Sequence, residues 1–261
     1  MPSPSFILYI YSLRSSPLLE NLVKKGYEVL LMVDPIDEYA MQNLVKYDSK
    51  YKLTNLGHEG VKFDDDEDDS QADHDEKFKP LMDYLTSQLS ERIGRVKVSN
   101  RLTRSPCALV AESWGYTATM ERIVKAQALS DPAATNTRTW VGRKVMEINP
   151  HHPIIIELNR LVKVSILFFF PHIKNQRHSR TLPTQEQENL KVVEDSVQLL
   201  LESAALTSGY GIDDPNLFSS RIQRIIGSSL DVELPREEKP AKHAVADEEA
   251  EEERTRDKDE L

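Results

Sequence analysis

The feature of this sequence that most constrains its fold is a pair of long apolar helical stripes near the carboxyl end. In residues 190–206, large aliphatic side chains recur every three or four positions, which places them on one face of a helix. Gly209 and Gly211 end this helix, and Asp214-Pro215 precedes a second stripe. The apolar positions are Val193, Val197, Leu200, Leu201 and Ala204 in the first stripe, and Leu217, Phe218, Ile222, Ile225 and Ile226 in the second.

Two consecutive helices with apolar faces this wide need more partners than each other. One interpretation is an ordinary hydrophobic core inside the chain. The other is half of a four-helix bundle, completed by the same two helices of a second copy. The periodicity of the sequence fits both interpretations.

Two acidic segments limit what can fold around these helices. Residues 63–76 contain little that a core could bury, and we interpret them as a solvated linker. Residues 231–261 are charged and almost free of large apolar side chains, which predicts a disordered tail. The 261 residues have a formal net charge of −10. This excess of acid argues against nucleic acid as a partner, because phosphate binding needs clustered Lys and Arg.

The first acidic segment also has a calcium-binding interpretation. Asp64, Asp66 and Asp68 alternate as in an EF-hand loop, but Asp69 and Asp75 stand where that loop needs Gly and Glu. Weak binding of calcium by the run of acids is the simpler interpretation. We therefore predict no metal site with defined ligands.

The rest of the chain alternates between helical and strand patterns, which predicts an α/β (α+β) fold. Residues 16–61 have the pattern of a helix, a strand and a second helix. Thr119 is the predicted N-cap of a later helix. The further predicted helices are 77–93, 120–129 and one starting at Pro153, and the further strands are 95–99, 107–112 and 144–148.

The single cysteine, Cys107, excludes an intramolecular disulfide and begins an apolar strand pattern. One interpretation is a buried small hydrophobe, and the alternative is a reactive thiol. An enzyme built on Cys107 and a histidine is a more distant hypothesis.

Targeting signals are few. No run reaches the ~20 apolar residues of a membrane-spanning helix, so no transmembrane segment is expected. Residues 6–11 are apolar but lack a preceding basic residue, which makes them a poor signal peptide. The last residues, Lys258, Asp259, Glu260 and Leu261, form KDEL, the address that the KDEL receptor reads for retrieval to the endoplasmic reticulum. We expect the chain to lie in the lumen of the endoplasmic reticulum if a signal peptide exists upstream, and in the cytoplasm otherwise.

Several long blocks resemble the heat-shock protein 90 family. Residues 15–44 (SSPLLENLVKKGYEVLLMVDPIDEYAMQNL) resemble the end of its middle domain, and residues 96–129 (VKVSNRLTRSPCALVAESWGYTATMERIVKAQAL) the opening of its carboxy-terminal domain. Residues 147–162 (EINPHHPIIIELNRLV) and 199–222 (LLLESAALTSGYGIDDPNLFSSRI) resemble the rest of that domain. With KDEL, the resemblance is to the endoplasmic-reticulum branch of the family.

The resemblance implies a domain organisation. A middle-domain remnant covers residues 14–62, the linker 63–76 follows, and a dimerisation and client-binding domain covers residues 77–230. Residues 164–187, which include an apolar aromatic run, are atypical of the family. We hypothesise that this insertion and residues 1–13 come from intron sequence translated as protein.

The resemblance also implies sites and partners, namely a homodimer and unfolded client proteins. The implied dimer interface is Leu200, Leu201, Ala204, Ile222, Ile225 and Ile226. The implied client-binding residues are Met120, Val124, Ile123, Trp114 and Tyr116. A flexible Met suits a surface that must fit many partners, and the alternative is that Met120 simply packs in the core.

Catalysis by this chain alone is not expected. The family's nucleotide-binding domain is absent, so ATP and magnesium belong to the full-length family, and no catalytic residue or bound cofactor is predicted here. The predicted function is a chaperone fragment that dimerises and binds clients within an ATP-dependent folding cycle. The rival prediction is a non-catalytic acidic luminal protein that buffers calcium.

Overall fold

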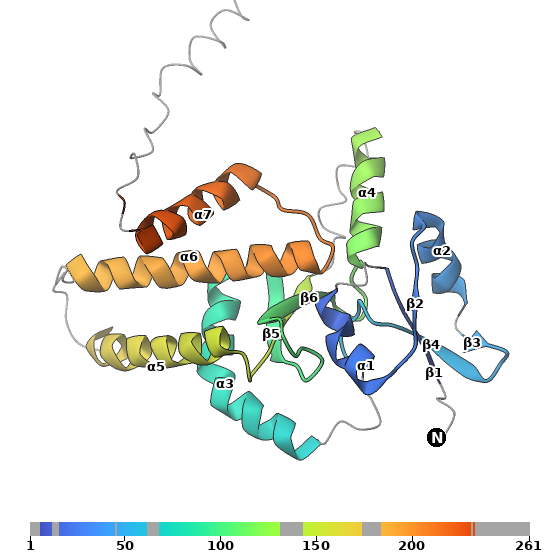
Figure 1. Ribbon diagram of the computed structural model, residues 1–261, viewed down its shortest axis with the longest axis horizontal. Coiled ribbons are helices and arrows are strands. Elements are labelled where there is room, and N and C mark those ends of the chain that lie inside the picture. The colour runs from blue at the N-terminus through green and yellow to red at the C-terminus, as the bar shows by residue number, and fades with distance from the viewer. Residues whose placement is uncertain are drawn as a thin grey trace, which may run out of the picture. The chain divides into compact units, whose positions relative to one another are not determined.

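The computed structural model describes residues 6–11, 16–44, 46–61, 68–130, 143–173, 184–230 and 232 (Figure 1). The chain divides into two compact units, residues 1–218 and 219–261, and each is described by itself. The first unit contains a four-stranded and a three-stranded sheet together with several helices, which confirms the predicted α/β (α+β) class.

The four-stranded sheet is built around the apolar opening of the chain. Strand β1 (Phe6–Ile10) pairs in parallel with β2 (Val29–Leu31) on one side and with β4 (Tyr51–Asn55) on the other. Strand β3 (Lys46–Tyr47) completes the order β2-β1-β4-β3 and is antiparallel to β4. A central parallel strand is covered on both faces, so its continuous apolar run reflects this position in the sheet.

Short helices connect these strands. The 3-10 turn η1 (Pro17–Leu19) and helix α1 (Glu20–Lys25) follow β1, and Gly26 ends α1 in the left-handed conformation, with φ 78°. Helix α2 (Pro35–Asn43) replaces a helix predicted over residues 37–47, and it ends earlier because the chain turns into the hairpin of β3 and β4. Neither strand of this hairpin was predicted.

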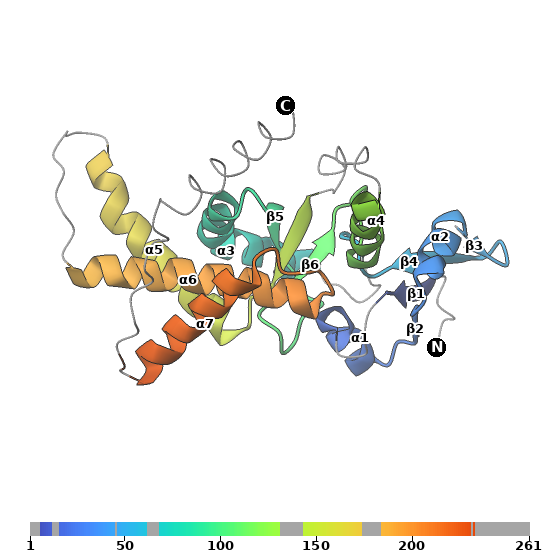
Figure 2. The same ribbon diagram turned by 90° about the horizontal axis from the view of Figure 1, so that it is seen from above.

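The three-stranded sheet matches the predicted strands closely. Strands β5 (Ile93–Val98), β7 (Lys144–Ile148) and β6 (Cys107–Ala111) lie in the order β5-β7-β6, with β5 parallel and β6 antiparallel to β7. In both views the second sheet lies between the first sheet and the helices α3, α5 and α6 (Figures 1 and 2).

The helices around the second sheet are longer than predicted. Helix α3 (Asp68–Gln88) begins within the segment predicted as a linker, rather than at Lys77. Helix α5 (Pro153–Ile173) starts at the predicted proline and continues into the atypical segment 164–187. Helix α6 is Thr184–Thr207, and α7 is Pro215–Leu230, which begins where the Asp214-Pro215 signal predicted. Among the described residues, none of these helices is both long enough and apolar enough to cross a bilayer.

Helix α4 (Ala118–Ser130) follows β6 and a short turn. Its first turn is capped by Thr117 and not by the predicted Thr119, since the amide of Met120 donates to Thr117 Oγ1 at 3.2 Å. A hydroxyl three residues before the amide that it accepts is the geometry of an N-cap.

Polar contacts join the two sheets across the predicted linker. The amide of Ala111 donates to the carbonyl of Gly57 at 2.8 Å, and the amide of Glu59 donates back to Ala111 at 2.9 Å. The buried guanidinium of Arg101 binds both the Glu147 carboxylate and the Leu56 carbonyl. The segments on either side of residues 63–76 therefore fold as one unit, while the predicted assignment to family domains remains a prediction.

A second clamp joins α1 to the loop before β6. The Glu20 carboxylate accepts hydrogen bonds from the amides of Thr103, Arg104 and Ser105 and from the Ser105 hydroxyl. Burial alone would raise the pKa of Glu20, but these four donors outweigh it and lower the pKa to about 2. The carboxylate is thus ionised across the physiological range.

Candidate client-binding and dimerisation sites

The predicted client-binding residues lie on α4 and on the turn before it. Trp114 is 98% exposed on that turn. Tyr116, Met120, Ile123 and Val124 are half-buried. Figure 1 shows α4 rising beside α2, with its carboxyl end directed away from both sheets. The turn and the first half of α4 therefore bring all five residues into one short stretch of the fold.

Met120 takes part in neither hydrophobic core of the described residues. One core lies between α3, α5, α6 and the second sheet, and the other lies between α1 and both sheets. The alternative that Met120 packs as an ordinary core residue therefore loses support. Its role toward clients stays a prediction.

Helix α4 is also fixed to its neighbours by charge. Glu121 is buried and forms ion pairs with Lys125 of α4 at 2.7 Å and with Lys144 of β7 at 2.9 Å. Burial would raise the pKa of Glu121, but the two ammonium groups outweigh it and hold the pKa below its usual range. The Lys144 ammonium also lies 4.7 Å from the centre of the Tyr210 ring. These contacts tie α4 to the second sheet through its polar side.

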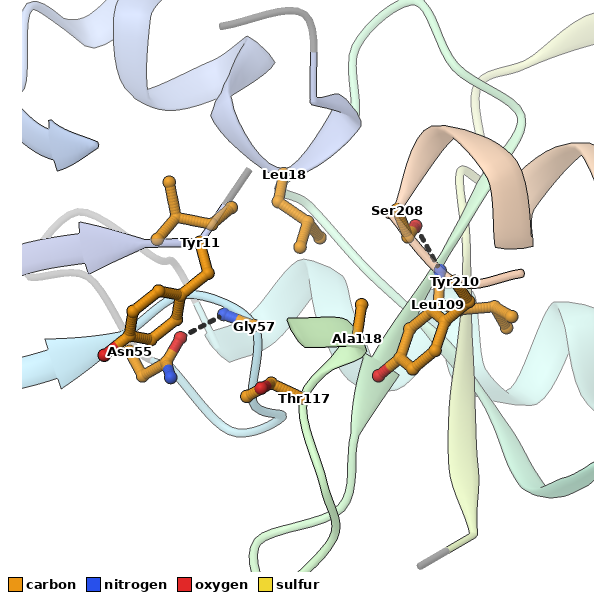
Figure 3. Close-up of a pocket in the computed structure, with 10 residues that line it drawn as sticks. Tyr11, Leu18, Asn55, Gly57, Leu109, Thr117, Ala118, Ser208 and Tyr210 are labelled. Atoms are coloured by element: carbon orange, nitrogen blue, oxygen red, sulfur yellow. Dashed lines mark hydrogen bonds between the residues drawn. The ribbon is translucent and has the colours of Figure 1, made fainter. Parts of the chain in front are cut away.

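A small pocket lies where α4 begins. Residues of β1, β4, the start of α4 and the turn after α6 line it, including Tyr11, Asn55, Thr117 and Tyr210 (Figure 3). Its volume is about 20 Å³, which holds about one water molecule. A cofactor-sized ligand needs a cavity of several hundred Å³. This pocket is therefore unsuited to a nucleotide.

The predicted dimer residues of α6 face the chain's own core. Leu201 and Ala204 are 1% and 2% exposed, and Leu200 is half-buried against the same core. On α7, by contrast, Ile222, Ile225 and Ile226 are 36%, 38% and 52% exposed. The core interpretation thus accounts for Leu201 and Ala204 of α6. Dimerisation through the α7 residues stays a prediction.

Cys107 is buried in β6, as the plainer interpretation predicted. Burial raises the pKa of its thiol to about 12, so the nucleophilic thiolate is scarce at neutral pH. An enzyme built on this thiol loses support for that reason. Among the described residues, no group of three or more His, Cys, Asp or Glu side chains is placed to hold a metal ion.

Two predictions fall on residues outside the described part of the chain. These are the KDEL signal with its acidic tail, and the start of the acidic run, residues 64–67. Retrieval and weak calcium binding therefore stay predictions. The atypical segment 164–187 is described only in part, as the end of α5 and the start of α6.

Sequence reasoning missed Glu38 and Thr117, which lie against α4. Glu38 of α2 is buried, and its carboxylate accepts a hydrogen bond from the Thr117 side chain. The spacing of Thr117 and Met120 could have identified the cap. The sequence around Glu38 gave no sign that this acid is buried, because Asp34 and Asp37 precede it and acids are usually exposed.

The comparisons with known proteins agree with the blocks described above. The profile of the Hsp90 protein family matches residues 9–166 and 175–260. An endoplasmin homolog of Dictyostelium discoideum is 43% identical over 225 residues, which cover 84% of this chain and 26% of that protein. An endoplasmin homolog of Arabidopsis thaliana is 38% identical over 241 residues, which cover 92% of this chain and 25% of that protein.

The chain spans about a quarter of the length of these curated relatives. The match to the family profile begins at residue 9, inside β1, and its interruption at residues 167–174 falls within the atypical segment. Because the match covers most of the sequence, this chain belongs to the Hsp90 family.

Proposed function

We propose that this chain is the dimerising and client-binding part of a chaperone of the endoplasmic reticulum lumen. The observation that carries the proposal is the exposed turn and helix at residues 114–124. There a fully exposed Trp114 and the half-buried Met120, Ile123 and Val124 lie outside both cores of the described residues.

The chemistry of this surface suits unfolded proteins. Burying one large aliphatic side chain contributes about 1.5–3 kcal/mol, so a few contacts give weak, reversible binding. Met120 has an unbranched and polarisable side chain, which can fit different apolar partners. Glu121 holds the polar side of α4 to Lys144 of β7, so the apolar side is presented from a fixed helix.

Dimerisation is proposed for α7. Its exposed isoleucines Ile222, Ile225 and Ile226 recur at spacings of three and four, so they share one helix face. A contiguous exposed apolar stripe marks an association surface. A second copy of the same helix would cover it in a two-fold symmetric contact.

We further propose that ATP hydrolysis is a property of the full-length family and not of this chain alone. The names of the two relatives, together with KDEL at the end of the sequence, support the endoplasmic reticulum as its location. Retrieval by the KDEL receptor is part of the same proposal.

The client-binding proposal is tested by replacing Met120. Affinity for a fluorescently labelled, permanently unfolded protein would be measured by anisotropy for the wild type and for Met120→Asp. We expect the dissociation constant to rise about tenfold, because one buried apolar contact is lost and a charge is added.

The matched control is Ile156→Asp, the same kind of change at a half-exposed aliphatic residue of α5. It should leave client affinity unchanged. Equal losses in both variants would indicate a general effect of charge, and an unchanged affinity in Met120→Asp would overturn the proposal.

A further inference from the structure

The carboxylate of Glu20 in α1 lies in a ring of donors from the loop before β6. Its Oε2 atom accepts hydrogen bonds from three successive amides, those of Thr103, Arg104 and Ser105, at 2.9, 2.7 and 3.2 Å. The Thr103 hydroxyl lies 3.3 Å from the same oxygen, and the Ser105 hydroxyl donates to Oε1 at 2.6 Å. Successive backbone amides that converge on one point form a concave site for anions. The loop therefore has the donors of an oxyanion hole.

Asn149, which directly follows β7, holds the loop from its other side. The residue is 1% exposed, and its side-chain amide donates to the carbonyl of Thr103 at 3.4 Å and to that of Ser105 at 3.1 Å. Its backbone amide donates to the carbonyl of Pro106 at 2.9 Å. These bonds engage the carbonyls of the loop, while its amides converge on Glu20. The ring of donors thus has a support that does not involve Glu20.

The start of the loop is fixed as well. Leu102 is 4% exposed and belongs to the core between α1 and both sheets. The buried guanidinium of Arg101 donates to the Glu147 carboxylate of β7 at 3.1 Å. A site whose donors are held in place before the ligand arrives pays little to bind it. The loop should consequently keep its shape when the Glu20 carboxylate is removed.

The ring of donors favours a charged and accessible ligand. Burial would raise the pKa of Glu20, but the hydrogen bonds, first that of the Ser105 hydroxyl and then those of the three amides, lower it to about 2. Glu20 and Ser105 are half-buried, and Thr103 and Arg104 are exposed. The site therefore lies at the surface, where a small ion can reach it once the Glu20 side chain is shortened.

We propose that residues 103–105 form a carboxylate-binding site whose shape is set by the second sheet, and that Glu20 fills it as an internal ligand. The ligand class is a small carboxylate, with one oxygen in the ring of amides and the other at the Ser105 hydroxyl. Helix α1 is thus attached to the loop by a contact that a free carboxylate can replace. The inference goes beyond the proposed function, since it concerns the attachment of α1 and not the client surface.

The test is chemical rescue of Glu20→Ala in the full chain by formate. Denaturant unfolding would be measured in sodium formate and in sodium chloride of the same ionic strength. So small a ligand binds with millimolar affinity at best, and we expect a dissociation constant on the order of 10 mM. Formate at about 100 mM should then lower the unfolding equilibrium constant of Glu20→Ala about tenfold relative to chloride.

Three controls separate this site from a general effect of the salt. The wild type should not respond to formate, because its tethered carboxylate occupies the site at high effective concentration. Formamide, the neutral analogue of formate, should not rescue Glu20→Ala, because donors bind a charged acceptor more strongly. The matched variant is Glu157→Ala of α5, which removes a carboxylate that the Arg160 side chain binds. It should be equally stable in formate and in chloride.

A second measurement locates the bound ion. The amide resonances of residues 103–105 in Glu20→Ala should shift during a formate titration and saturate with the same dissociation constant. If Glu20→Ala does not fold in chloride, formate should restore its folding, and failure to do so would overturn the inference. Equal stability in formate and chloride would also overturn it, as would a saturating response that leaves residues 103–105 unchanged.

Discussion

Helices α4 and α6 both carry apolar side chains that the family resemblance assigns to partners, yet the fold treats them differently. On α4, Met120 lies outside both cores of the described residues, and Trp114 just before the helix is fully exposed. On α6, Leu201 and Ala204 lie inside the core that the helix forms with β6 and its neighbours. A wide apolar face in the sequence thus predicts that a helix is covered. It does not predict whether the chain's own core or another molecule covers it.

The two helices differ because they are attached to the rest of the chain by different kinds of contact. Helix α4 is held by its polar side, through the buried carboxylate of Glu121 and the ammonium of Lys144. Its half-buried Met120, Ile123 and Val124 belong to neither core of the described residues. Helix α6 is held by its apolar side, so a partner can reach only its outer residues, among them the half-exposed Leu206.

The largest effect should come from truncating α6. Leu201→Ala removes a fully buried side chain, and we expect it to lower the free energy of unfolding by about 2–5 kcal/mol. Denaturant unfolding followed by circular dichroism measures this change. Leu206→Ala, on the exposed side of the same helix, is the matched control and should cost less than about 1 kcal/mol. Similar losses in the two variants would show that α6 is not packed as described.

The next largest effect concerns the polar attachment of α4. Glu121→Gln weakens two ion pairs at a buried position, and we expect a loss of about 2 kcal/mol at pH 7. Because folding lowers the pKa of Glu121, its contribution is present above the ordinary carboxyl pKa and is lost as pH falls through the folded value. The difference in stability between wild type and variant should therefore shrink in acid. A difference that grows in acid would contradict the assignment.

A smaller effect is expected for association through α7. Ile226→Ala should raise the dissociation constant of the dimer about tenfold, since each copy loses part of one apolar contact. Light scattering across a dilution series measures this constant. Ile156→Ala of α5 is the control, and it should leave the molar mass curve unchanged. A monomer at every concentration of the wild type would remove the dimerisation proposal altogether.

The smallest effect is expected for the stability of the client surface itself. Met120→Ala should change the free energy of unfolding by less than about 0.5 kcal/mol, because the residue contributes to neither core of the described residues. Thermal unfolding of Met120→Ala and Leu201→Ala, each against the wild type, measures the two losses of stability. A loss approaching that of Leu201→Ala would restore the interpretation of Met120 as a core residue.

Much of the second sheet and its helices could be predicted, because the signals are local. Strands β5, β6 and β7 and the starts of α5 and α7 follow from short apolar runs, turn residues and prolines nearby in the sequence. Strand β1 could not be assigned in this way. Its partners on β2 and β4 are far along the chain, and its apolar run also fits a poor targeting signal.

The candidate site was predictable only in part. The residues of α4 could be chosen from the resemblance, but periodicity left open whether Leu201 faces a core or a second copy. Glu38 was missed because its burial, and its interactions with Tyr9, Thr117 and Tyr210, depend on segments that are far apart in the sequence. Such a cluster is a property of the tertiary structure and leaves no local pattern.

The most direct test of the account is the footprint of an unfolded client on the chain. Amide hydrogen exchange would be followed with and without a saturating, permanently unfolded protein. We predict new protection at residues 114–124 and unchanged exchange along the buried part of α6, residues 197–205. Protection confined to α6 or α7, or none at residues 114–124, would contradict the claim that residues 114–124 bind clients.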